Sequence, residues 1–233
     1  MPLPKAYVSW SSGKDSAWAL QVARAGGLAE VAGLLTTVNT THGRVAMHAV
    51  RRELLHAQAA ALALPLVEVE LPWPCPNGTY EAAMAAALAR LRGDGVTHLV
   101  FGDLFLEDVR AYRDAQLAAL GMTPIYPLWR RDTRALAREM VDGGLRATLT
   151  CVDPKQLDAS FAGRRFDAAL LAELPASVDP CGERGEFHTF AYAGPMFRRP
   201  VAIDSGELVE RDGFVFADLL PAKAAVTPPA AAT

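Results

Sequence analysis

The sequence contains little cysteine: Cys75, Cys151 and Cys181 are its three cysteines in 233 residues. They form no Cys-x-x-Cys pair and no cysteine–histidine cluster with the spacing of a structural zinc site. A sparse, odd number of cysteines is typical of proteins from a reducing compartment, where disulfides are rare. These features argue against a zinc module or a disulfide scaffold, and we expect a cytoplasmic protein.

Long apolar runs and blocks of like charge are missing as well. No stretch approaches about 18 uncharged apolar residues, which a membrane-spanning helix needs, and the amino terminus lacks the apolar segment of a signal peptide. The formal net charge is −3, without a run of five or six like charges. The sequence therefore predicts no membrane contact. It does not support a nucleic-acid partner, since a strong nucleic-acid interface needs a basic patch, although RNA stays open as a partner.

What the sequence does have is an apolar content of 51%, enough to bury a core, and a regular alternation in its first half. Strand-like and helix-like segments follow one another with short connections. This order predicts a parallel, Rossmann-like sheet with helices on both faces. The predicted strands are residues 6–10, 31–38, 66–71, 97–103 and 124–128, and the predicted helices are residues 14–25, 47–64, 80–91 and 107–120.

The second half has a different pattern. It predicts helices at 133–142 and 168–173, a strand at 146–152, a turn-rich segment at 180–190, and strand-like pieces at 197–203, 207–211 and 213–216. We therefore expect a first domain over residues 1–130 and a smaller α+β domain over residues 131–222. The alanine- and proline-rich end has no core-forming pattern, so residues 223–233 are expected to be a disordered tail.

The segment "WSSGKDSAWAL" joins the first predicted strand to the first helix, where such sheets bind ligands. Its spacing differs from the Walker loop, which has four residues between its first glycine and Gly-Lys-Ser/Thr. The helix start attracts phosphate through unpaired N–H groups and its dipole. Gly13 allows close approach, Ser11 and Ser16 offer hydroxyls, Lys14 offers a mobile charge, and Asp15 is a candidate magnesium ligand. The alternative is a serine-capped helix after a tight turn.

The motif "SSGKDS" resembles the SGGKDS loop of the PP-loop ATP pyrophosphatases. Ser12 stands where that family has its second glycine, an exchange we expect to be harmless if Ser12 has a negative φ. The resemblance implies a HUP-type sheet of five parallel strands. It also implies ATP and Mg²⁺ as cofactors, with ATP cleaved between its α- and β-phosphates to give AMP and pyrophosphate.

Three further segments, residues 47–66, 101–113 and 179–190, resemble the diphthine–ammonia ligase branch of that family, and the likeness covers most of residues 5–221. The last segment is the specific one, because the loop alone occurs in many PP-loop families. The resemblance implies an amide-forming ligase that adenylates a carboxylate and passes it to ammonia. The implied partners are ATP and AMP, ammonia and an unknown carboxylate acceptor, either a small molecule or a protein. Whether the protein is a homodimer stays open.

Outside the loop, the resemblance favours His48, Arg51, Gly102 and Asp103 as further ATP-binding residues. Gly102 and Asp103 end a predicted strand at the ligand edge of the sheet. The alternatives are an exposed helical turn for His48 and Arg51 and a capping role for Asp103. The charged residues at 107–113 are expected to form a solvated helix face.

The motif "CGERGEFHT" carries two carboxylates, Glu183 and Glu186, between glycines. Together with Lys14 and Asp15 of the loop they are the predicted catalytic residues. Two carboxylates in such a turn are suited to bind ammonium or to take its proton, and we expect His188 and Thr189 to support that ammonia and acceptor site. The alternative is a charged surface turn. For Cys181 we favour a packing role.

Two other functions remain open. One is a tRNA-modifying PP-loop enzyme, such as a thiolase or a lysidine synthetase. The sparse cysteines and acidic balance argue against it. The other is a sensor that binds ATP or AMP without turnover.

Overall fold

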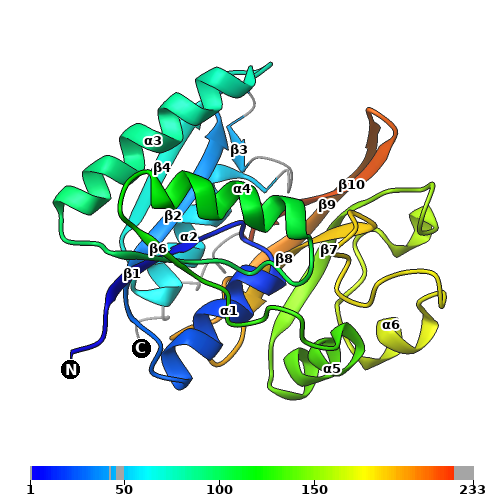
Figure 1. Cartoon of the computed structure of the whole chain (residues 1–233). Helices are drawn as coiled ribbons and strands as arrows, with labels where there is room; N and C mark the ends of the chain where they lie inside the picture. The colour runs from blue at the N-terminus through cyan, green and yellow to red at the C-terminus, as the bar shows by residue number, and fades with distance from the viewer. Residues whose placement is uncertain (1, 42, 46–49, 223–233) are drawn as a thin grey trace, which may run out of the picture.

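The computed structural model describes residues 2–41, 43–45 and 50–222. Helices lie on both sides of a central sheet, and a second sheet lies beside it (Figure 1). The predicted tail at 223–233 and the candidate His48 lie outside the described residues. Within the described residues, no helix has both the length and the apolarity needed to cross a membrane.

The central sheet has five parallel strands in the order β4-β2-β1-β5-β6, which confirms the predicted fold class. A short strand, β3, pairs with β2 in the antiparallel direction at Val38 and Asn39 and was not predicted. The strands are β1 (Lys5–Ser9), β2 (Glu30–Asn39), β3 (Arg44–Val45), β4 (Leu66–Leu71), β5 (His98–Val100) and β6 (Thr123–Ile125).

The helices cover both faces because adjacent side chains of a strand point in opposite directions. Leu34 packs in a cluster with α1 (Lys14–Ala25) and α2 (Arg52–Leu62). Its neighbour Leu35 packs in another cluster with α3 (Asn77–Gly93), and Leu117 of α4 (Glu107–Ala118) joins the same cluster. The sheet is thus buried on both sides, as parallel sheets usually are.

The second predicted helix begins later than expected. The structure starts α2 at Arg52, whereas the sequence pattern predicted residue 47. Arg51 has extended backbone angles, φ −62° and ψ 139°, and forms an isolated bridge with Arg44. Pairing with Arg44 therefore keeps Arg51 outside the helix, and residues 47–49 of the predicted helix lie outside the described residues.

The C-terminal part is an antiparallel sheet in the order β8-β7-β10-β9, which confirms the α+β class of this part. Its elements are α5 (Thr133–Asp142), β7 (Arg146–Val152), the 3-10 turn Ala159–Phe161, α6 (Ala168–Glu173), β8 (Phe187–Ala193), β9 (Ile203–Arg211) and β10 (Phe214–Pro221).

Two details of this part were predicted wrongly. Most of β8 was not expected, because its side chains are buried on both faces and lack the alternation of a half-exposed strand. The strand expected at 197–203 is irregular up to residue 202. Pro200 lacks the N–H group that a paired strand needs.

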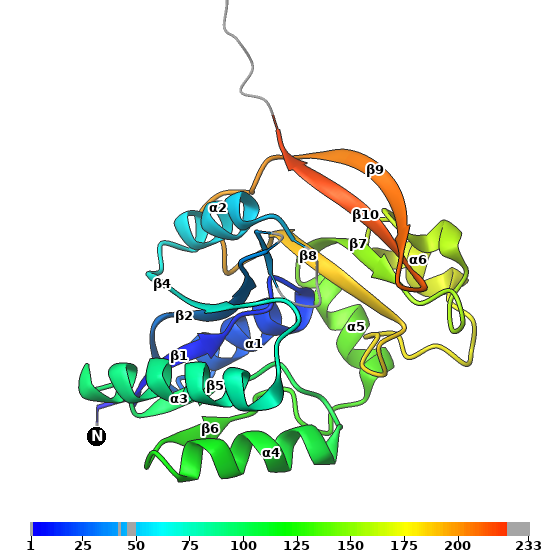
Figure 2. The same cartoon turned by 90° about the horizontal axis from the view of Figure 1, so that it is seen from above.

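β8 is an edge strand of the second sheet and packs against α1 of the first part (Figure 2). Phe187 and Phe190 of β8 belong to the same hydrophobic cluster as Trp10 and Leu20. The division of the chain near residue 130 stays a prediction. In space, one hydrophobic core joins the two halves and holds β8 beside the loop after β1.

Candidate active site

The loop after β1 lies where the strand order reverses. From β1 the chain passes to β2 and β4 on one side, and later to β5 and β6 on the other. The carboxyl ends of β1 and β5 therefore border a crevice of the kind that binds ligands in such sheets. Residues 11–16 leave β1 at this crevice, and residues 101–103 leave β5 there.

Ser12 adopts a left-handed backbone conformation, with φ +70°, so the condition under which its exchange for glycine was expected to be harmless is not met. Its carbonyl oxygen accepts hydrogen bonds from the Ala191 N–H at 2.9 Å and the Gln58 amide at 3.0 Å. Gln58 is fully buried, and its Oε1 accepts a bond from the Trp10 indole at 2.9 Å. These contacts from α2 and β8 hold a conformation that costs a non-glycine residue energy.

Lys14 is a fixed charge and not the mobile one that the sequence suggested. Its side chain is 2% exposed and its Nζ donates to Asp15 Oδ2 at 2.8 Å, and also to the Cys181 carbonyl oxygen. The ammonium lies 5.5 and 5.3 Å from the ring centres of Phe166 and Phe187. Burial alone would lower the pKa of Lys14, but the surrounding acidic groups, Asp15 foremost, together outweigh burial and raise that pKa, so the charge persists.

The start of α1 is capped from a distant strand. The N-cap is Gly13, whose own N–H donates to Ser11 Oγ at 3.3 Å. The N–H of Lys14 donates to Thr189 Oγ1 of β8 at 3.0 Å. The hydroxyls of Ser11 and Ser16 lie 3.2 Å apart. The loop is therefore more than a serine-capped turn, because β8 organises the helix end that was predicted to bind phosphate.

Gly102 brings the end of β5 against the first turn of α1. A Cβ atom at this position would lie 2.7 Å from the Asp15 carbonyl carbon and 2.8 Å from the Ser16 nitrogen. Only a residue without a side chain fits there. Gly102 thus sets how closely the β5 segment approaches the loop.

Gly102→Ala should therefore displace the start of α1. We expect a loss of about 1–3 kcal/mol in the free energy of unfolding, typical of overpacking, together with weaker ATP binding. Urea denaturation and calorimetric titration with ATP measure the two effects. Gly78→Ala is the matched control, since a Cβ at Gly78 meets nothing within 4 Å. Equal stability and ATP affinity for both variants would contradict this role of Gly102.

Asp103 holds an arginine that sequence reasoning had placed on a solvated helix face. Its Oδ1 accepts bonds from Arg113 Nη2 at 3.1 Å and Nε at 3.2 Å. The Arg113 guanidinium lies 4.5 Å from the centre of the Phe101 ring. Charge pairing and ring stacking thus fix this cation at the crevice. The spacing of residues along α4 does not report these contacts, because both partners of Arg113 lie in the segment that follows β5.

The two predicted carboxylates of the turn have different surroundings. Glu183 accepts a bond from the Leu104 N–H at 2.8 Å, and burial raises its pKa to about 7. Glu186 is 1% exposed, and its two oxygens accept bonds from the N–H groups of Asp179 and Arg184 at 2.8 and 2.9 Å. Its carboxylate thus faces into its own turn, and the predicted contact of Glu186 with ammonia finds no support in this geometry.

Two further side chains of this segment, His188 and Cys181, differ in exposure: His188 is half-buried and Cys181 is buried. Burial lowers the pKa of His188 to about 4, which keeps its imidazole neutral. Cys181 is 1% exposed, and its thiol contacts the Thr133 carbonyl oxygen at 3.4 Å. Burial raises the pKa of Cys181, so this thiol is suited to packing and not to nucleophilic attack.

Most of the predicted residues line one cavity of about 390 Å³, which we call the loop pocket. They come from the loop after β1, the end of β5 and the turn before β8. Those lining it are Ser11, Lys14, Asp15, Ser16, Gly102, Asp103, Glu183, His188 and Thr189. The structure thus brings three distant segments together, as their predicted roles require.

A cavity of about 480 Å³ adjoins the loop pocket, and we call it the aromatic pocket. Both are lined by Ser11, Phe101 and Arg113. Tyr80 and Tyr112, from α3 and α4, line the aromatic pocket. The sequence analysis missed this part of the site, because apolar and aromatic side chains on a helix have the same spacing whether they line a pocket or pack in the core.

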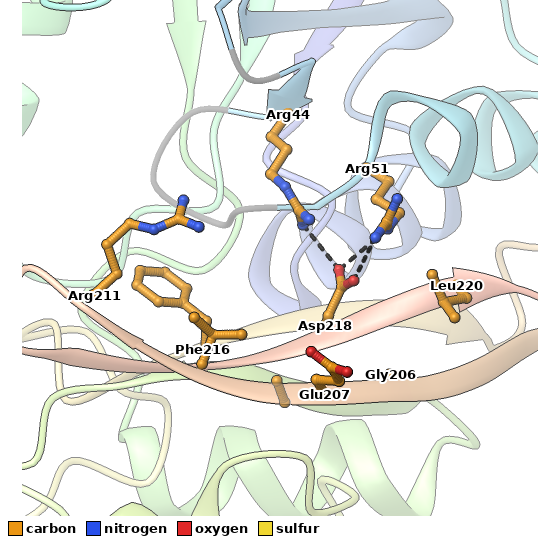
Figure 3. A pocket seen from close by; sticks show the side chains of 10 residues that line it. Arg44, Arg51, Gly206, Glu207, Arg211, Phe216, Asp218 and Leu220 are labelled. Carbon is orange, nitrogen blue, oxygen red and sulfur yellow. Dashed lines mark hydrogen bonds and ion pairs between the residues drawn. The ribbon is translucent and has the colours of Figure 1, made fainter.

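Arg51 lies elsewhere. Arg51 and Arg44 both pair with Asp218 of β10, at 2.5 and 2.9 Å (Figure 3). Arg51 lines neither the loop pocket nor the aromatic pocket. The structure therefore does not bring Arg51 to the loop after β1, and its predicted contact with ATP finds no support here.

The protein supplies few carboxylates for a metal. Among the described residues, no group of three or more histidine, cysteine, aspartate or glutamate side chains is arranged to hold an ion. Magnesium at nucleotide sites usually needs one or two carboxylates, since phosphates and water complete its shell. Asp15, with 26% of its side chain exposed, fits that smaller requirement.

Comparison with known proteins agrees with the motifs. The family model for the diphthamide synthase N-terminal domain matches residues 4–124, and that for the C-terminal domain matches residues 132–218. The diphthine–ammonia ligase of Danio rerio is 37% identical over 106 residues, which are 43% of this chain and 41% of the relative. The Homo sapiens ligase is 33% identical over 103 residues, 42% of this chain and 39% of the relative.

The relative from Schizosaccharomyces pombe, also named diphthine–ammonia ligase, is 32% identical over 95 residues, 39% of this chain and 16% of the relative. The chain thus matches less than half the length of each of these curated relatives. The family models, in contrast, together account for most of the chain. On this basis the chain belongs to the diphthamide synthase family.

Proposed function

We propose that this protein is an ATP-dependent ligase that adenylates a carboxylate and transfers the acyl group to ammonia. The observation that carries the proposal is the loop pocket, where the start of α1, a fixed lysine and a carboxyl group of raised pKa line one cavity. The names of the relatives give the same reaction class, with diphthine as their acceptor. For this chain, the use of a carboxylate acceptor is itself part of what we propose.

ATP would lie across both pockets. The triphosphate suits the loop pocket, because Lys14 and the start of α1 supply positive charge there. The base and ribose suit the aromatic pocket. The α-phosphate would then lie at the junction of the two pockets. Ser11 and Arg113 mark this junction, because they line both pockets. We assign to Arg113 the task of holding that phosphate.

The reaction needs two displacements. An oxygen of the acceptor carboxylate attacks the α-phosphorus, the bond to the bridging β-phosphate oxygen breaks, and pyrophosphate leaves. Ammonia then attacks the acyl carbon and AMP leaves with the electron pair of the broken C–O bond. A magnesium ion held by phosphate oxygens and Asp15 would neutralise charge on the leaving pyrophosphate. The chain itself contributes fixed charge and position.

The second displacement needs a base, because the nitrogen must lose protons on the way to an amide. Glu183 lines the loop pocket beside Lys14 and Asp15. Burial raises its pKa to about 7, so its carboxylate is a stronger base than an ordinary glutamate at neutral pH. We therefore assign proton removal to Glu183 alone, in place of the predicted pair with Glu186.

Asp15→Asn tests the first step. We expect AMP formation to fall by about 10²–10³-fold, the usual effect of removing one electrostatic contact in a phosphoryl-transfer site. Asparagine keeps the shape and an acceptor for Lys14, which limits the loss of stability. AMP released from ATP with magnesium, ammonium and an extract of the producing cells as the source of acceptor measures the rate. Asp94→Asn, outside the pockets, is the control.

An unchanged rate of AMP formation in Asp15→Asn would overturn the assigned role of this carboxylate. Tight ATP binding by the unaltered protein, without AMP formation from any acceptor, would favour the sensor instead. These two outcomes can be told apart. In the first, the unaltered protein still forms AMP, whereas in the second it does not.

A further inference from the structure

A third cavity, of about 310 Å³, lies between the β9–β10 hairpin and the loop after β4, and we call it the hairpin pocket. Its lining includes Trp73 of the loop after β4 and Phe214 and Phe216 of β10. No step of the proposed reaction has used it so far. Its volume suits a group as large as a small metabolite.

The hairpin pocket adjoins both parts of the nucleotide site. Leu71 and Cys75 line it and the aromatic pocket as well. His188 lines it and the loop pocket. A group in the hairpin pocket therefore borders both pockets that we assign to ATP. To be adenylated, its carboxylate must reach the α-phosphate between those two pockets.

Aromatic rings at the opening favour an apolar guest. The side chain of Trp73 is 61% exposed and that of Phe214 is 36% exposed. Large rings exposed next to a cavity often mark a binding site, because a guest that covers them removes apolar surface from water. A purely charged metabolite would gain nothing from these rings.

The cation at this opening favours an anion. Arg211 lines the hairpin pocket and makes no ion pair with any residue in the described ranges. Arg211, Phe216 and Asp218 lie on the same face of the hairpin, and Arg44 lies opposite that face (Figure 3). Arg44 already pairs with Asp218 at 2.9 Å, so Arg211 is the cation that remains for a guest.

We propose that the hairpin pocket binds the carboxylate acceptor, as a small molecule with an apolar body. The body packs against Trp73 and Phe214, and Arg211 attracts the carboxylate before it reaches the α-phosphate. This inference rests on the proposed function, since it names the substrate class that the same site would take. It also explains why the second domain places its hairpin beside the nucleotide site.

Cys75 provides a direct test, because it lines the hairpin pocket and is half-buried, whereas Cys151 and Cys181 are 2% and 1% exposed. Iodoacetate carries a carboxylate, and iodoacetamide is its neutral counterpart. In both reactions the Cys75 sulfur forms a bond to carbon and iodide leaves. The quantity to measure is the ratio of the two alkylation rates at Cys75, read by peptide mass spectrometry.

We expect this ratio to exceed that of free cysteine by about tenfold, the effect of one favourable charge contact. Arg211→Gln should return the ratio to the free-cysteine value, whereas the control Arg90→Gln, at an exposed position of α3, should leave it raised. Phenylacetate should protect Cys75 more than phenylacetamide does, and Phe214→Ser should weaken that protection.

A ratio equal to that of free cysteine, or one insensitive to Arg211→Gln, would overturn the proposal. So would equal protection by phenylacetate and phenylacetamide. None of these measurements involves ATP, so they separate failure of this pocket assignment from failure of the ligase proposal. The latter would show as absent AMP formation with the alkylation ratio still raised.

Discussion

Glu183→Gln is expected to lower the rate of amide formation by about 10²–10⁴-fold, the usual contribution of a positioned general base. Glutamine keeps the acceptor for the Leu104 N–H but takes up no proton. Release of pyrophosphate should change little, because that step does not use the carboxylate. Rapid-quench analysis of AMP, pyrophosphate and amide at saturating ammonium separates the two steps. Glu81→Gln, on the exposed face of α3, is the matched control.

The pH dependence gives the same prediction a second readout. Burial raises the pKa of Glu183 to about 7. Below that pH the group is protonated and accepts no proton, whereas above it the carboxylate is free to act. Amide formation should therefore rise from pH 6 to pH 8 with an inflection near pH 7, and Glu183→Gln should lose the inflection. An inflection that persists in the variant would assign the base to another group.

Glu186→Ala is expected to destabilise the fold by about 3–6 kcal/mol, as two charge-assisted hydrogen bonds are worth about 1.5–3 kcal/mol each. The N–H groups of Asp179 and Arg184 would lose their acceptor in a buried turn. Such a loss is a large part of the stability of a typical domain. Urea unfolding measures this loss. Glu207→Ala, on the exposed side of β9, is the control, and it should change the free energy of unfolding by no more than about 0.5 kcal/mol.

Glu186→Gln refines this test. Its amide oxygen replaces one of the two acceptors, so an intermediate stability is expected. If Glu186→Ala instead kept full stability and lost amide formation alone, the carboxylate would serve ammonia directly. That result would restore the role that the spacing of the two glutamates suggested.

The sequence predicted the five parallel strands and the place of the loop, because both depend on local patterns. An apolar strand, a serine–glycine turn and a helix beginning at Lys14 are all legible within twenty residues. Strand order in the sheet then follows the usual rule for alternating strands and helices. The family motifs agreed with these local signals, so the fold class needed no long-range information.

The surroundings of the loop were not predictable in the same way. The conformation of Ser12 depends on Gln58 of α2 and Ala191 of β8, which are far away in sequence. A buried lysine is rare, and the burial of Lys14 is possible because the Cys181 carbonyl oxygen and the Asp15 carboxylate accept hydrogen bonds from its ammonium. No spacing rule reports such contacts.

The two glutamates show the same limit within a single turn. Their separation in sequence shows that both lie near one another, but not which carboxylate faces inward. Backbone N–H groups of Asp179 and Arg184 select Glu186 for the interior of the turn. Glu183 is left to face the loop pocket.

Pyrophosphate–ATP isotope exchange tests the central claim most directly. Purified protein with magnesium and ATP would be measured with and without an extract of the producing cells as a source of acceptor. The proposed ligase predicts exchange that requires the extract and falls about 10²–10³-fold in Asp15→Asn. ATP binding without exchange, even with an extract that contains both proteins and small molecules, would contradict adenylation as the function of this site.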